Sequence, residues 1–224
     1  MMGSLRSTTA MFLKDFRSEL RTRYALTALM LFVITTLSII LFSIGNESVS
    51  PEILSGVLWI IVFFSAMSGL SRTFVSEEER GTVLTLQLLA KPLTVFFGKL
   101  LFNFALLASL NTVAGTLYII LINDFVVKNY AIFLLTMLLG TLGLSAASTI
   151  IAAVVSKANT KGTLYPVMAF PILLPLLLTV ISATRLAVEG APFSEAAGEF
   201  RVLFSYFVVI VAVSYLVFEF IWKD

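Results

Sequence analysis

The sequence predicts an all-α integral membrane protein with six transmembrane helices, forming a single domain over residues 1–224. Its composition, its long apolar stretches and the distribution of its basic residues each support this prediction. Hydrophobic residues make up 59% of the chain, charged residues make up 12%, and the mean hydropathy is +1.02. Soluble domains contain about 25% charged residues, so this chain has too little polar material to cover a globule in water.

Six apolar stretches reach the length of roughly 20 residues that a helix needs to cross the hydrocarbon core. They cover residues 24–44, 53–71, 95–122, 130–155, 163–184 and 202–218. The third and fourth exceed this length, so they are expected to tilt or to begin outside the core. The fifth contains Pro166, Pro171 and Pro175, which lack an N–H group, so we expect this helix to be kinked or broken. A tolerated membrane-helix kink and a hinge or lining for a substrate path both fit these prolines.

The basic residues predict that both termini lie in the cytoplasm, because loops on that side of a membrane are enriched in Lys and Arg. With the N-terminus inside, twelve of the fifteen basic residues fall on the cytoplasmic side, and Lys99 is counted among them. The three on the opposite side are Lys128, Arg185 and Arg201. The external segment 185–201 is interpreted either as a solvated connection or as a docking surface.

The residue types that are missing exclude several kinds of chemistry. The chain has no Cys and no His, so it lacks the commonest metal ligand and general base. We therefore expect no catalytic site and no metal site. No charge is expected in the interior of a span, and the nearest ones, Arg72 and Glu219, sit at span ends, which argues against coupling to an ion gradient.

ATP and nucleic acid are also not expected to bind this chain. Gly98-Lys99 lacks the rest of the phosphate-binding motif GxxxxGKS/T, so any ATP must be hydrolysed by another chain. The net charge is only +2, and no basic block suggests nucleic-acid binding.

Residues 11–23 predict a basic amphipathic helix ahead of the first span. Leu13, Phe16, Leu20 and Tyr24 share one face at helical spacing, and basic residues occupy the other faces. Such a helix is expected to lie in the headgroup layer, either as a simple anchor or as a point where force enters the protein.

The segment between the second and third spans, residues 72–99, is interpreted as a second point where a partner could act. Three successive carboxylates, Glu77 to Glu79, precede a predicted short helix over about residues 82–90, which ends before Pro92. The carboxylates are expected to favour the N-terminus of this helix. Its apolar side chains need a groove in a partner or in the same protein, or else contact lipid; they are Val83, Leu84, Leu86, Leu88 and Leu89.

Small and amide residues inside the spans predict close helix packing. Gly143 and Ala147 share a face of the fourth span, and Asn111 lies inside the third. An unpaired amide in hydrocarbon is costly, so Asn111 is expected to find a hydrogen-bond partner. These contacts are expected mainly within the bundle, with some at an interface between two copies.

The segment after the second span resembles the permeases of the ABC-2 class of ATP-binding-cassette transporters. That class carries, in order, a glutamate, a Gly-Thr pair, apolar residues, a proline and a Gly-Lys pair; here the last is Gly98-Lys99. The resemblance implies that the short helix is a coupling helix that docks in a cleft of an ATPase subunit. The implied coupling residues are Glu77, Glu78, Glu79, Arg80, Gly81, Thr82, Val83, Leu86, Leu89 and Pro92.

Within this class, the chain is most similar to the CcmB family, the haem exporter B subunits of the cytochrome c maturation system. The similar stretches are residues 16–26, 42–45, 56–74, 138–154 and 165–178. The family implies a multi-pass protein of the bacterial inner membrane, in lipid. Its implied partners are a CcmA-like ABC ATPase subunit, a second permease copy, CcmC-like and CcmD-like subunits and a haem chaperone.

The resemblance implies a non-catalytic subunit whose complex serves haem export or the release of the haem-loaded chaperone. Haem iron is usually held by His, Cys, Met or Tyr, and the first two are missing here. We therefore expect no cofactor bound by this chain alone, with haem ligands supplied by partners and ATP bound by the ATPase. Two alternatives stay open: an ABC-2 exporter of lipid, polysaccharide or drug, and a non-ABC scaffold or passive channel.

Overall fold

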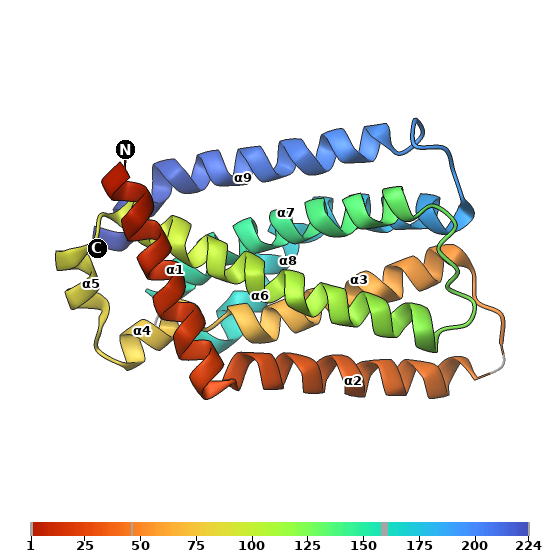
Figure 1. Ribbon diagram of the computed structural model, residues 1–224, viewed down its shortest axis with the longest axis horizontal. Coiled ribbons are helices and arrows are strands. Elements are labelled where there is room, and N and C mark those ends of the chain that lie inside the picture. Colours follow the sequence, from red (N-terminus) through yellow and green to blue (C-terminus); the bar gives the residue numbers. More distant parts are fainter. Residues whose placement is uncertain (1, 46, 158–160, 224) are drawn as a thin grey trace.

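The computed structural model describes residues 2–45, 47–157 and 161–223, and these residues form nine α-helices (Figure 1). The helices are α1 (Met2–Thr22), α2 (Tyr24–Ile44), α3 (Pro51–Leu70), α4 (Val75–Glu79), α5 (Val83–Leu89), α6 (Pro92–Leu121), α7 (Tyr130–Ser156), α8 (Lys161–Glu189) and α9 (Ala197–Lys223). Six of them, α2, α3 and α6 to α9, are long and apolar enough to span a membrane. This confirms the prediction of an all-α, multi-pass membrane protein.

Several spans extend beyond their predicted ends. α6 begins at Pro92 instead of residue 95, because a proline suits the first turn, where its missing N–H needs no partner. α8 runs to Glu189 and α9 begins at Ala197. The segment predicted as the loop 185–201 is therefore largely helical, and only residues 190–196 connect the two helices.

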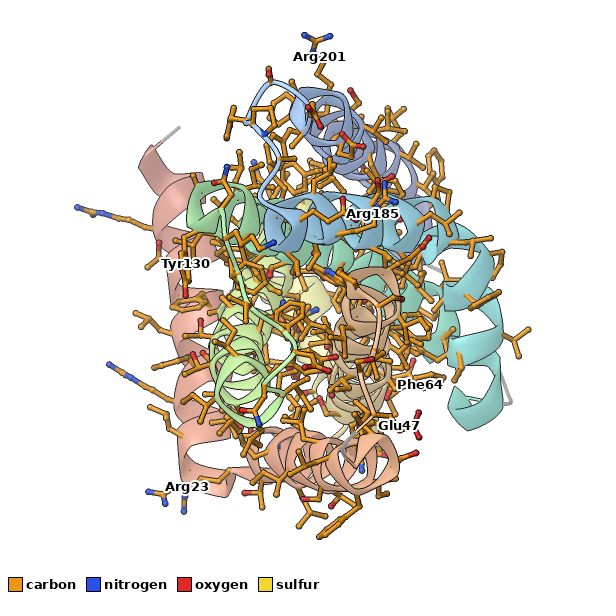
Figure 2. The ribbon with its side chains drawn as sticks, turned by 90° about the vertical axis from the view of Figure 1, so that its right-hand side faces the viewer. Arg23, Glu47, Phe64, Tyr130, Arg185 and Arg201 are labelled. Atoms are coloured by element: carbon orange, nitrogen blue, oxygen red, sulfur yellow. The ribbon has the colours of Figure 1, made fainter. Side chains whose placement is uncertain are left out.

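The bundle has two different ends, and Figure 1 shows both chain termini at one of them. We call this the terminal end; it also carries α1, α4 and α5. At the far end, seen from outside in Figure 2, lie residues 47–50, which precede α3, and the connections 122–129 and 190–196. Of the basic residues, Lys128, Arg185 and Arg201 belong to this far end, so the predicted division of charge matches the two ends of the fold.

α7 is the most enclosed of the six spans and forms the centre of the bundle. Small residues let its neighbours approach closely: Gly140 lies against Trp59 of α3, and Gly143 lies against Leu176 of α8. The side-chain amide of Asn111 in α6 donates a hydrogen bond of 2.7 Å to the hydroxyl of Thr141 in α7. The predicted packing roles of Gly143 and Asn111 are thus fulfilled within one chain.

α1 turns sharply into α2 at Arg23, whose φ of 52° lies in the left-handed region. The carboxylate of Glu19 accepts a hydrogen bond of 3.0 Å from the backbone N–H of Leu26, and this caps the first turn of α2. The corner lays α1 across the terminal end of the bundle, where it packs on α6 (Figure 1).

α8 continues through its three prolines as one helix. Pro166, Pro171 and Pro175 are all exposed on the surface of the bundle, so their rings do not displace a packed neighbour. Their assignment as helix-kink residues stays a prediction.

Candidate functional site

The predicted coupling segment folds into two short helices joined by a glycine turn. α4 carries the three glutamates, and its C-terminus ends in a Schellman motif. In this motif the N–H of Gly81 donates to the carbonyl of Glu78 and the N–H of Thr82 donates to the carbonyl of Glu77, each at 3.0 Å. Gly81 has a φ of +66°, a conformation that glycine adopts without strain. The turn reverses the chain and sets the direction of α5.

α5 matches the predicted short helix and presents two different faces. Leu84, Leu88 and Leu89 are 72%, 88% and 80% exposed. On the other side, Val83 and Leu86 are half-buried against the core. Leucines this exposed at the terminal end form an apolar surface that the other residues described in the structure leave uncovered.

A hydrogen bond holds α5 against α9. The side-chain amide of Gln87 donates to the backbone carbonyl of Trp222 in α9. The ring of Trp222 stacks on Phe218 with 5.7 Å between centroids, and Phe218 in turn lies 5.8 Å from Phe74, just before α4. The carbonyl that Gln87 contacts therefore belongs to a residue of an aromatic cluster between α9 and the start of α4.

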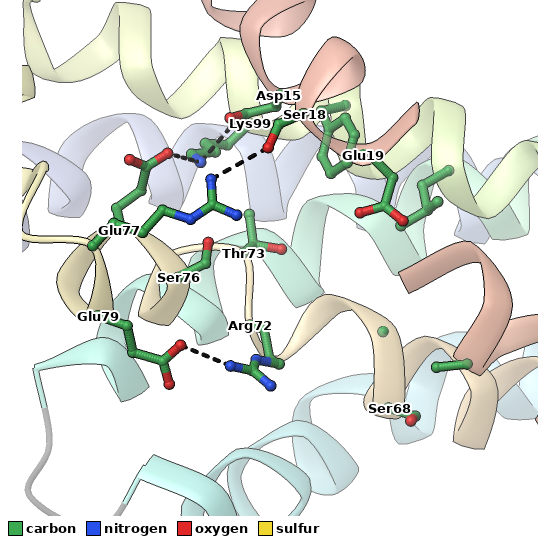
Figure 3. A pocket seen from close by; sticks show the side chains of 15 residues that line it. Asp15, Ser18, Glu19, Ser68, Arg72, Thr73, Ser76, Glu77, Glu79 and Lys99 are labelled. Carbon is green, nitrogen blue, oxygen red and sulfur yellow. Dashed lines mark hydrogen bonds and ion pairs between the residues drawn. The ribbon is translucent and has the colours of Figure 1, made fainter. Parts of the chain in front are cut away.

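Glu77 does not lie on the exposed surface with the rest of the segment, because the residue is only 3% exposed. It pairs with Lys14 of α1 and with Lys99 of α6, and both lysines also pair with Asp15 of α1. We call these four residues the ion cluster; Figure 3 shows Asp15, Glu77 and Lys99. The Nζ of Lys99 lies 2.8 Å from Oε1 of Glu77 and 3.0 Å from Oδ2 of Asp15. The same Glu77 oxygen accepts from Lys14. Glu77 keeps its predicted place beside the N-terminus of α5 through its bond from Thr82, whereas its pairing with lysines of α1 and α6 was not predicted.

The position of Lys99 corrects two expectations from the sequence: that this lysine belongs to a solvated cytoplasmic segment, and that no charge lies inside a span. Lys99 lies in the second turn of α6 rather than in a cytoplasmic loop, and it is 2% exposed. A buried ammonium is costly unless opposite charges surround it. Glu77 and Asp15 supply those charges, which explains how an apolar helix can hold a lysine inside the protein.

The other predicted coupling residues lie around this cluster. Glu79 pairs with Arg72 at 2.7 Å, and Arg80 donates to the hydroxyl of Ser18 at 3.2 Å, both near the surface (Figure 3). Thr82 is the N-cap residue of α5, and its hydroxyl donates to Oε2 of Glu77. Glu78 is half-buried, and Pro92 begins α6.

A cavity of about 380 Å³ lies between α1, α2, α3, α4 and α6. The ion-cluster residues Asp15, Glu77 and Lys99 line it together with Arg72 and Arg80. Below it, the buried amide of Asn103 donates to Thr149 of α7 and accepts from Thr73 beside α4. The terminal end thus holds a polar network inside a largely apolar protein.

The family comparison covers all of these elements. Residues 6–220 match the family model described as CcmB protein. The chain belongs to the CcmB family. This confirms the resemblance seen in the sequence, and the match includes most of α1, the predicted coupling segment and almost all of α9.

Two curated relatives carry the name Heme exporter protein B. The protein from Bradyrhizobium diazoefficiens is 25% identical over 193 residues, which cover 83% of this chain and 86% of the relative. The protein from Rhodobacter capsulatus is 25% identical over 195 residues, which cover 84% of this chain and 89% of the relative.

In this CcmB-family chain, the sequence pattern found α5 but missed the partners of Glu77. The apolar residues that predicted α1 lie on its exposed face, since Leu13, Phe16 and Leu20 are 40%, 40% and 50% exposed. The face that packs on the protein carries Met11 and Asp15, both buried. The carboxylate of Asp15, one helical turn after Met11, was the available signal for this packed face. Its role becomes clear only from its pairing with Lys99 of α6.

Proposed function

We propose that this chain is the membrane permease subunit of an ATP-driven complex for cytochrome c maturation in the bacterial inner membrane, with both termini cytoplasmic. Such a complex would serve haem export or the release of a haem-loaded chaperone. The observation that carries the proposal is the exposed leucine face of α5, in a member of the CcmB family.

Physical reasons support an ATPase as the partner of that face. The sequence has no phosphate-binding loop, so a chain that is moved by ATP must receive its motion from another protein. Leu84, Leu88 and Leu89 on a short helix offer the kind of apolar anchor that fits a groove in a partner. The turn at Gly81 and the contact of Gln87 with Trp222 hold this anchor in a fixed direction.

The other partners follow from the same family. We expect a second copy of the permease, two copies of a CcmA-like ATPase, CcmC-like and CcmD-like subunits and a haem chaperone. The names of the two relatives support haem as the group that the complex serves. Because this chain has no His and no Cys, the axial ligands of that haem belong to partner subunits.

The test is purification of the complex from its native membrane in mild detergent, with the bound chains identified by mass spectrometry. We expect a nucleotide-hydrolysing subunit and haem-handling subunits to be recovered with the unaltered chain. Leu88→Glu places a charge on the leucine face of α5. This variant is expected to lower recovery of the ATPase about tenfold or more, because central apolar anchors dominate interface energies.

Phe193→Glu is the matched control, since Phe193 is an exposed apolar residue in the connection at the far end and is 50% exposed. This variant should recover the ATPase as the unaltered chain does. An ATPase recovered without haem-handling subunits would instead support an exporter of lipid, polysaccharide or drug. Absence of any nucleotide-hydrolysing chain would favour a scaffold or passive channel and end the proposal.

A further inference from the structure

The ion cluster connects the coupling segment to two other helices at once. Glu77 is on α4, Lys14 and Asp15 are on α1, and Lys99 is on α6. We infer that Asp15 and Lys99 are positioning residues, through which a displacement of α5 moves α1 and α6 together. This inference rests on the proposed function and adds to it the path that the motion takes.

The first step of the path runs from α5 to the carboxylate of Glu77. Thr82, at the start of α5, donates to Glu77 from both its backbone N–H and its hydroxyl, and the hydroxyl also reaches the carboxylate. The N-terminus of α5 and the Glu77 side chain are therefore tied together. A force on the leucine face that displaces the N-terminus of α5 should also displace the Glu77 side chain.

The second step runs from Glu77 into α1 and α6. One oxygen of Glu77 accepts from both Lys14 and Lys99, and Lys99 is also paired with Asp15. Separating these groups would leave Lys99 charged and buried without a counter-charge, which is strongly unfavourable. The contact should therefore survive a displacement that would break an ion pair in water.

The third step makes α1 and the start of α6 behave as one unit. Gly98, the residue before Lys99, lies directly against the side chain of Met11 in α1. Because residue 98 has no side chain, the two helices approach closely at this point, and the Asp15–Lys99 pair lies one turn further along α1. α1 therefore has to follow α6 when Glu77 moves.

The polar network then continues from α6 into the bundle. Asn103 lies one turn after Lys99 and is hydrogen-bonded to Thr149 of the central helix α7. Among the described residues, the path from the leucine face to the middle of the bundle is thus Thr82, Glu77, Lys99 and Asn103. Its first links are charged or hydroxyl groups rather than apolar contacts.

The experiment uses the purified complex of permease and ATPase in lipid. The unaltered chain has no Cys, so cysteines at Arg17 on α1 and Glu52 at the far end allow two spin labels and a distance measurement. We expect ATP to change this distance in the unaltered complex. Lys99→Met should still recover the ATPase, lose the ATP-dependent change of distance and lower transport-linked activity about tenfold.

Two further variants separate positioning from folding. Lys99→Arg keeps the charge and should restore the distance change. Asp15→Asn keeps the shape and the Lys99–Glu77 pair, so it should fold with the unaltered melting temperature and show a reduced change of distance. Glu189→Gln, in the exposed pair with Arg185 at the far end, is the matched control and should behave as the unaltered chain.

The inference is overturned if the distance does not respond to ATP in the unaltered complex, or if Lys99→Met and Asp15→Asn respond as fully as the unaltered chain does. Those results would leave the proposed function standing, because the ATPase would still be bound. Failure to recover any ATPase with the unaltered chain would remove the proposed function and this inference with it.

Discussion

The side-chain amide of Asn103 in α6 donates a hydrogen bond of 2.8 Å to the hydroxyl of Thr149 in α7, and both side chains are 0% exposed. The carbonyl oxygen of the same amide accepts a bond of 3.0 Å from Thr73, just before α4. Three segments that are distant in the sequence therefore meet on one side chain. This makes Asn103 the best single position at which to test the polar network below the coupling segment.

Asn103→Leu is expected to lower the free energy of unfolding by about 1–3 kcal/mol, because it removes two buried hydrogen bonds between segments, each worth about 0.5–1.5 kcal/mol. The measurement is thermal or denaturant unfolding in detergent micelles. Ser109→Ala in the same helix is the control, since Ser109 is exposed and bonds only to the carbonyl of Ala105 in its own helix. Equal stability of the two variants would contradict a structural role for the network.

Gly98→Ala is expected to loosen α1. A Cβ on residue 98 would lie 2.6 Å from the Cβ of Met11, and neither helix can give way easily. Overpacking of this kind costs about 1–3 kcal/mol, and it should make Arg17 and Arg21 more accessible to trypsin.

The control for this variant is Gly56→Ala in α3, where an added Cβ meets nothing within 4 Å. Alanine should stabilise that helix by about 0.5–1 kcal/mol relative to glycine. If Gly98→Ala is as stable and as resistant to trypsin as Gly56→Ala, then the close contact between α1 and α6 is not present in the protein.

Gly81→Val is expected to misdirect α5 while leaving the bundle folded. The space around residue 81 is open, so the effect comes from its φ of +66°, which costs a residue with a Cβ about 1–2 kcal/mol. Recovery of the ATPase should fall, whereas the melting temperature of the bundle should stay the same. Gly81→Asn should behave close to the unaltered chain, because asparagine tolerates this conformation better than valine does; equal loss with both would show that the glycine is needed for another reason.

Single cysteines are expected to react from opposite sides of the membrane. Arg17→Cys on α1 should be labelled by a membrane-impermeant maleimide only when the cytoplasmic side is opened, and Glu52→Cys at the far end should be labelled from outside intact spheroplasts. The unaltered chain contains no Cys and gives the background. The reverse pattern would invert the proposed orientation and place α5 away from any ATPase.

The parts of the fold that depend on local pattern were predictable. Six long apolar stretches and a short apolar helix before Pro92 are encoded in consecutive residues, and the structure contains all of them. The ends of the spans were less predictable, since α8 and α9 continue past their apolar stretches through charged residues such as Glu189 and Glu199. A helix ends where its backbone hydrogen bonds end, and hydropathy does not record that position.

The ion cluster was not predictable in the same way. Glu77 meets Lys14 across 63 positions and Lys99 across 22 positions of the sequence. In a linear sequence these residues look like ordinary charges beside a membrane, and the Lys and Arg count assigned all of them to the same solvated side. Only the crossing of α1, α4 and α6 shows that Asp15, Glu77 and Lys99 are buried.

The central position of α7 limits the kinds of motion that this bundle can make. Gly140 and Gly143 fit against Trp59 and Leu176 with no space to spare, because a methyl group at either glycine would overlap its neighbour. A shift of α7 along its own axis would place larger side chains against Trp59 and Leu176, and steric overlap would block it. The bundle should therefore respond to a push at its edge by tilting as a block about α7, and the lipid around α2 and α9 would have to absorb the resulting change of shape.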